Sequence, residues 1–113
     1  MDQLNHYRTL VRSCLLEWHA YMTRSPLSGV DTECIFDDDR GHYLIANSGW
    51  HAGERVREAF IHIRIRDGKI WIEEDGTEDG IATELIRAGI PRDDIVLAFH
   101  PPQLRHLTEF ASA

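Results

Sequence analysis

Seven histidines are the side chains of this sequence best suited to holding a metal ion, because a neutral imidazole is a common ligand of transition metals. Their spacing matches no familiar site, since no two lie four residues apart as on a metal-binding helix face and no Cys-x-x-Cys is present. We therefore expect neither a specific metal site nor a cofactor. Ordinary surface or hydrogen-bonded roles account for these histidines, which are His6, His19, His42, His51, His62, His100 and His106.

Two acidic clusters offer a second chemistry, because grouped carboxylates can hold Mg²⁺ for phosphoryl transfer or nucleic-acid cleavage. The first cluster is the run 37–39. The second contains no Lys or Arg and comprises Glu73, Glu74, Asp75, Glu78, Asp79 and Glu84. Aspartate is also common in turns, and acidic residues stabilise a helix start by facing its positive end. A metal-dependent nuclease that uses these acids stays an alternative to a purely structural role.

No set of residues forms a recognisable nucleophile with its base. Asp67-Gly68-Lys69 resembles half of a nuclease site, but an Asp-Gly pair is also typical of a hairpin turn. The sequence contains neither the phosphate-binding glycine loops nor the nucleophile elbow Gly-x-Ser-x-Gly. Because neither Cys14 nor Cys34 has a base assignable from the sequence, we expect a protein that is not an enzyme.

Basic and aromatic residues gather in the middle of the chain. Five of the twelve basic residues fall within the stretch 55–69, namely Arg55, Arg57, Arg64, Arg66 and Lys69. Strand alternation is expected to place Arg64, Arg66, Lys69 and Trp71 on one face together with Phe60. Such a surface fits either a nucleic acid, whose bases stack on aromatic rings, or a protein interface. The net charge of −7 favours the protein interface and argues against direct nucleic-acid binding, which stays the alternative.

The composition predicts one globular domain over residues 1–113, with 42% hydrophobic and 27% charged residues. The longest apolar run, 95–99, is far too short to cross a membrane, and no signal peptide is visible, so we expect a cytoplasmic protein with no membrane partner. In that compartment Cys14 and Cys34 are expected to be reduced core thiols, with a disulfide as the alternative.

Hydrophobic spacing predicts a long helix at the N-terminus, followed by strands. Apolar residues recur at intervals of three and four over residues 3–24, and Ser25-Pro26 ends the predicted helix. Short alternating segments then predict strands over residues 33–36, 42–50, 55–66 and 69–73.

The Asp67-Gly68 pair predicts a two-residue hairpin and therefore its register. The expected pairs are Arg66 with Lys69, Ile65 with Ile70, Arg64 with Trp71, Ile63 with Ile72, and His62 with Glu73. The isoleucine face must be the core. The outer face would carry a cation–π pair between Arg64 and Trp71 and an opposite-charge pair between His62 and Glu73.

A second helix is expected to begin near Thr77, which would cap it, and to end at Gly89. The apolar run 95–99 predicts a buried strand, and the segment 103–113 fits either a short helix or an extended conformation. The order predicts an α+β domain with a mainly antiparallel sheet. This sheet would be a four-strand meander plus a C-terminal strand, with the long N-terminal helix and the second helix packed on one face.

Ordered motifs run along nearly the whole chain. They are Gly49-Trp50, Arg55-Val56, His62-Ile63, the runs 67–72, 75–78, 80–82 and 88–91, Glu84-Leu85, the run 94–97 and the ending Phe99-His100-Pro101-Pro102 with Arg105 and 108–111. In these motifs the sequence resembles the XisI family, whose members are called fdxN-element excision controlling factors.

The resemblance implies a role and not a reaction, because the family has no catalytic motif to carry over. XisI proteins are associated with XisH proteins, which resemble nuclease-fold proteins, in the cyanobacterial control of excision by a site-specific recombinase. We therefore expect a non-enzymatic regulatory protein that binds an XisH-type partner and also forms a homodimer through exposed Phe60 and Trp71. The partner-binding residues we predict are Phe60, His62, Arg64, Arg66, Trp71, Glu73, Arg105 and Glu109.

Overall fold

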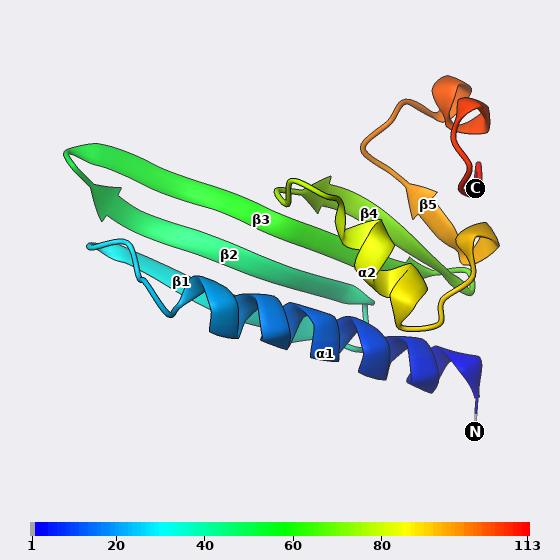
Figure 1. Cartoon of the computed structure of the whole chain (residues 1–113), viewed down its shortest axis with the longest axis horizontal. Helices are drawn as coiled ribbons and strands as arrows, with labels where there is room; N and C mark the ends of the chain where they lie inside the picture. The colour runs from blue at the N-terminus through cyan, green and yellow to red at the C-terminus, as the bar shows by residue number, and fades with distance from the viewer. Residues whose placement is uncertain (1) are drawn as a thin grey trace.

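The computed structural model describes residues 2–113, which fold as two helices on one face of a five-stranded sheet (Figure 1). The strands are β1 (Val30–Asp37), β2 (His42–His51), β3 (Glu54–Arg66), β4 (Lys69–Asp75) and β5 (Ile95–Leu97). They lie in the order of the chain; the first four form an antiparallel meander, and β5 runs parallel to β4. This arrangement confirms the predicted α+β class.

Helix α1 (Gln3–Met22) packs its apolar stripe onto the sheet through the buried Tyr7, Val11 and Leu15. The Asp2 carboxylate caps the helix by accepting a hydrogen bond from the Asn5 amide at 2.8 Å. The helix ends two residues earlier than the spacing predicts. Two amides satisfy the last carbonyl groups, because Thr23 donates to the His19 carbonyl oxygen at 3.0 Å and Arg24 donates to that of Tyr21 at 3.3 Å.

Both tight turns of the meander use positive φ angles. Asp67 and Gly68 have φ values of 53° and 75°, and Ala52 and Gly53 have 51° and 78°. Two consecutive residues of this kind match the natural twist of a two-residue hairpin. The predicted β3–β4 turn is therefore confirmed.

The β3–β4 register is confirmed for the four pairs nearest the turn and is wrong for the fifth. An irregularity between His62 and Ile63 shifts the pairing, so that His62 lies opposite Glu74 instead of Glu73. Glu73 instead faces Arg64, whose Nη1 lies 4.0 Å from its Oε2. The expected His62–Glu73 pair does not form because β4 has one extra residue, Glu73, between the residues that pair with His62 and Ile63.

Trp71 is covered, which contradicts the expectation of an exposed aromatic residue on an open sheet face. Its side chain is only 8% exposed. The guanidinium groups of Arg66 and Arg105 lie over its ring at 4.4 and 5.6 Å from the centroid, whereas Arg64 does not make the predicted cation–π contact. Arg105 comes from the C-terminal segment, which therefore closes this part of the sheet.

Phe60 also differs from its predicted position. The β2–β3 pairing shifts between Ile45 and Ala46, so Phe60 has no partner opposite it, and the alternation changes phase at this point. The Phe60 ring turns to the helix side of the sheet and packs against the core and Trp18. It does not share a face with Arg64 and Trp71.

Helix α2 (Ile81–Arg87) begins four residues later than predicted, because Thr77 belongs to the loop before the helix. Asp75 organises this loop. Its Oδ1 accepts hydrogen bonds from the amide and the hydroxyl of Thr77 at 3.0 and 2.6 Å, and its Oδ2 accepts one from the Ile81 amide at 2.8 Å. Asp75 therefore satisfies the start of α2, and Gly80 makes the bend with a φ of 90°.

The C-terminal segment forms two short 3-10 helices, η1 (Arg92–Asp94) and η2 (Pro102–Leu107), on either side of β5. Arg105 anchors the segment by donating to the carbonyl oxygens of Ala98 and His100, each at 3.1 Å. The Ala111 amide donates to the Ile95 carbonyl oxygen at 2.8 Å. The chain therefore ends beside β5 (Figure 1), and this strand is two residues shorter than the predicted run 95–99.

Both cysteines are free, partly buried thiols that pack against the core, as predicted. Burial raises the pKa of Cys34, and the same cause together with the Glu84 carboxylate raises the pKa of Cys14 to about 12. Neither helix of residues 2–113 is long and apolar enough to cross a membrane.

Candidate functional site

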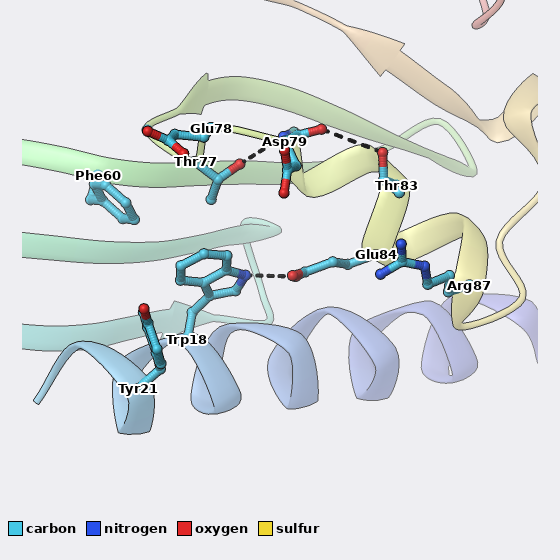
Figure 2. Close-up of a pocket in the computed structure, with 11 residues that line it drawn as sticks. Trp18, Tyr21, Phe60, Thr77, Glu78, Asp79, Thr83, Glu84 and Arg87 are labelled. Carbon is cyan, nitrogen blue, oxygen red and sulfur yellow. Dashed lines mark hydrogen bonds between the residues drawn. The ribbon is translucent and has the colours of Figure 1, made fainter. Parts of the chain in front are cut away.

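A cavity forms a groove between α1, the middle of β3, the loop that precedes α2, and α2 itself (Figure 2). Its volume is about 630 Å³. Three aromatic side chains and three acidic side chains line it, and we call it the Trp18 groove after the residue at its centre. The aromatic residues are Trp18, Tyr21 and Phe60, and the acidic residues are Glu78, Asp79 and Glu84.

Trp18 connects the other two aromatic rings. Its ring centroid lies 5.7 Å from that of Tyr21 in an edge-to-face arrangement and 6.2 Å from that of Phe60. Tyr21 is 62% exposed, so it forms the open side of the wall, while Phe60 rests on the core. The groove is thus bounded on one side by aromatic surface.

Gly76 is needed for the position of Phe60. A Cβ at residue 76 would lie 2.5 Å from two ring atoms of Phe60, and the Gly76 amide donates to the Phe60 carbonyl oxygen at 2.7 Å. The phase change in β3 and this glycine together bring the ring into the groove. Neither the alternation of β3 nor the spacing of Gly76 indicates this contact in the sequence.

Glu84 lies opposite Trp18 and is held by two donors from α1. The Trp18 Nε1 donates to its Oε2 at 2.6 Å (Figure 2), and the Cys14 Sγ donates to the same oxygen at 3.4 Å. No hydrogen bond to the second oxygen, Oε1, comes from residues 2–113. One carboxylate oxygen thus anchors α2 to α1 and the other stays available.

The groove carries a negative charge. Glu78, Asp79 and Glu84 line it with Arg87, which is the one basic side chain among the lining residues of the described chain. Glu17 lines an adjoining hollow with Trp18, Tyr21 and Glu84. Arg24 also lies near the wall, with its guanidinium 5.8 Å from the centre of the Tyr21 ring. Counting Glu17 and Arg24, four carboxylates face two guanidinium groups, which leaves a formal charge of −2 around the aromatic wall.

The outer face, the side of the sheet opposite the helices, holds most of the predicted partner-binding residues. His62 and His42 meet there, with 2.9 Å between His62 Nε2 and His42 Nδ1. Burial lowers the pKa of His62, and the neighbouring His42 lowers it further. Sequence reasoning missed this pair, although the confirmed meander places the two residues diagonally across β2 and β3.

The other predicted partner-binding residues lie in separate parts of the structure. Arg64, Arg66 and Glu73 stay on the outer face, and Arg105 is largely occupied in fastening the C-terminal segment over Trp71. Glu109 is an exposed residue whose carboxylate lies 3.6 Å from Arg92. Phe60, in contrast, lies in the Trp18 groove, so the predicted set does not form one surface.

The acidic clusters form no arrangement typical of a metal centre. Within residues 2–113, no three His, Cys, Asp or Glu side chains converge as metal ligands. In the first cluster, the Asp38 carboxylate instead accepts a hydrogen bond from the Tyr43 hydroxyl and pairs with Arg12, each at 2.7 Å. The Tyr43 hydrogen bond and then Arg12 lower the pKa of Asp38, whereas burial, followed by the Asp38 carboxylate, raises the pKa of Tyr43 to about 12.

Comparison with known proteins agrees with the resemblance seen in the sequence. The family model described as XisI protein matches residues 1–112. A structure of a XisI-like protein from Anabaena variabilis is 34% identical, with a TM-score of 0.91 over 97% of this chain and 99% of that one.

A structure of the fdxN element excision controlling factor XisI from Anabaena variabilis is 40% identical, with a TM-score of 0.88 over 99% of this chain and 100% of that one. No curated protein sequence matches this chain. The family match and both structural matches span nearly the full length of the chain. The chain therefore belongs to the XisI family.

Proposed function

We propose that this protein is a non-enzymatic regulatory factor that takes part in controlling excision of a DNA element by binding an XisH-type protein. The observation that carries the proposal is the full-length likeness to a structure named as an fdxN element excision controlling factor, at 40% identity.

The physical character of the chain supports a binding role. A net charge of −7 attracts a basic partner and repels a phosphate backbone. The Trp18 groove adds a concave surface with aromatic and charged groups, which is the composition typical of a recognition site.

Direct DNA binding is the less favoured alternative, because Trp71, the residue predicted to stack on bases, is not exposed. Base stacking needs an exposed ring, but Trp71 is 8% exposed and lies under Arg66 and Arg105. The nuclease alternative is also less favoured, because both carboxylate oxygens of Asp75 already accept hydrogen bonds. Oδ1 accepts from the Thr77 hydroxyl, and Oδ2 accepts from the Ile81 amide at the start of α2. We therefore favour the protein-binding role over both.

The homodimer stays a prediction, but other exposed residues now support it. Phe60 and Trp71 are not the exposed pair that it was based on, but Trp50 and Ile35 on the outer face are 61% and 49% exposed. Sedimentation should give a mass near twice 13.0 kDa if a second copy covers these residues, and a 13.0 kDa species alone would contradict the dimer.

The proposal is tested by mixing the purified protein with an XisH-type protein. We expect a complex at low salt that weakens as salt is added, because the anionic surface attracts its partner over a distance set by ionic strength. A protein that forms no complex at low salt, or that turns over a substrate by itself, would overturn the proposal.

A further inference from the structure

We propose that the Trp18 groove binds an arginine side chain displayed by the partner protein. This inference rests on the proposed function, because it says which surface of this chain takes part and what chemistry the partner must present. The argument has three steps, which concern the charge of the groove, its aromatic wall and the free oxygen of Glu84.

The charge of the groove selects a cation. Glu78, Asp79, Glu84 and the adjoining Glu17 outnumber Arg87 and Arg24, so a bound guanidinium would offset the excess negative charge around the groove. A ligand with a carboxylate or a phosphate would add to this repulsion. The occupant is therefore cationic.

The aromatic wall favours a flat cation. Trp18 and Tyr21 meet edge to face in the wall of the groove (Figure 2), and Trp gives the strongest cation–π attraction of the aromatic side chains. A guanidinium is planar and weakly hydrated, so it stacks on a ring more readily than the compact ammonium of lysine does.

Glu84 can fix the orientation of that cation. Its Oε2 is already held by Trp18 and Cys14, which prevents the side chain from turning away, and its Oε1 faces no donor within residues 2–113. A guanidinium stacked on Trp18 would lie beside a carboxylate that is already in position. Little conformational entropy is then lost on binding.

The experiment titrates the full-length protein with N-acetyl-arginine methylamide and follows the indole N–H signals of its three tryptophans by NMR. We expect the Trp18 signal to shift in a saturable way, and the lysine analogue to bind about threefold more weakly. The exposed Trp50 serves as an internal control for unspecific stacking. Equal shifts of Trp18 and Trp50, or equal affinity for the two analogues, would overturn the inference.

Matched variants separate a specific site from general charge. Glu84→Gln keeps an acceptor for the Trp18 indole but removes the charge, and should weaken arginine binding about tenfold. Glu54→Gln makes the same change of charge at the exposed first residue of β3 and should leave binding unchanged. Similar losses in both variants would show that only the net charge matters and would contradict the site.

The same variants distinguish this inference from the proposed function. If the XisH-type protein binds the native chain and Glu84→Gln equally well, the groove assignment is wrong and the regulatory role stands. If the arginine probe binds at Trp18 but the XisH-type protein does not bind at all, the groove assignment stands and the proposed partner is wrong. Loss of partner binding in Glu84→Gln alone supports both.

Discussion

Replacing Asp75 by alanine tests whether this acidic residue has a structural role. Asp75 belongs to the cluster that could have formed a nuclease site, yet its carboxylate accepts three hydrogen bonds from the loop and from α2. Two of the donors, the amides of Thr77 and Ile81, would lose their partner. We therefore expect Asp75→Ala to destabilise the fold, and Asp75→Asn to do so by less.

The magnitude follows from the contacts. Loss of a helix cap costs about 1 kcal/mol, and a hydrogen bond to a charged group contributes about 1.5–3 kcal/mol. Because Asp75 is only partly buried, water can replace some of these bonds, and we expect a loss of about 2 kcal/mol. Asparagine keeps one accepting oxygen, so about half of this loss should remain.

Urea unfolding followed by circular dichroism measures the effect. With a slope of about 2 kcal/mol per molar, a loss of about 2 kcal/mol lowers the midpoint by about 1 M. Asp79→Ala is the matched control, because its carbonyl oxygen, which alanine retains, is the acceptor for the Thr83 hydroxyl. We expect this control to change the unfolding free energy by less than about 0.5 kcal/mol. Equal midpoints for Asp75→Ala and Asp79→Ala would refute the capping role.

Three further predictions follow from close contacts and shifted pKa values. Gly49→Ala should lower the unfolding free energy by about 3 kcal/mol or more in urea, because its Cβ would lie 2.0 Å from the Gly29 carbonyl oxygen. Native Cys14, with its pKa raised to about 12, should react with iodoacetamide far more slowly at pH 8 than the same thiol in urea, as mass spectrometry can measure, and equal rates would contradict its burial. The pKa of Asp38 is lowered, so its contribution to stability is present above about pH 4 and is lost as the pH falls through the lowered pKa. Asp38→Asn should therefore flatten the acid limb of a stability profile, and an unchanged limb would argue against that contribution.

The sequence predicted the meander well because local signals determine it. Asp67-Gly68 adopts the two positive φ angles that its hairpin needs, and the alternating isoleucines 61, 63 and 65 all lie in the core. The apolar stripe of α1 likewise identified Tyr7, Val11 and Leu15. These features depend on neighbours within a few residues, so periodicity is sufficient to find them.

The parts that could not be predicted depend on contacts between distant segments. Phe60 leaves the expected face because of a bulge against β2, and a bulge depends on how a whole strand packs. Thr77 looks like a helix cap, but Asp75 binds it into a loop, which delays the start of α2. The C-terminal cover over Trp71 has no periodic signal at all.

The Trp18 groove was missed for the same reason. Its walls come from α1, β3, the loop before α2 and α2 itself, and Trp18 and Glu84 alone are 66 positions apart in the sequence. Acidic residues near a predicted helix start have a sufficient local explanation, and Trp18 fits an ordinary apolar stripe. Only the fold shows that these two patterns meet in one cavity.

Calorimetric titration of this protein with an XisH-type protein tests the central claim, which is that the chain acts by contact with a basic partner. We predict saturable binding at low salt that weakens as the ionic strength rises. The absence of binding heat at low salt, at more than one temperature, would contradict the account.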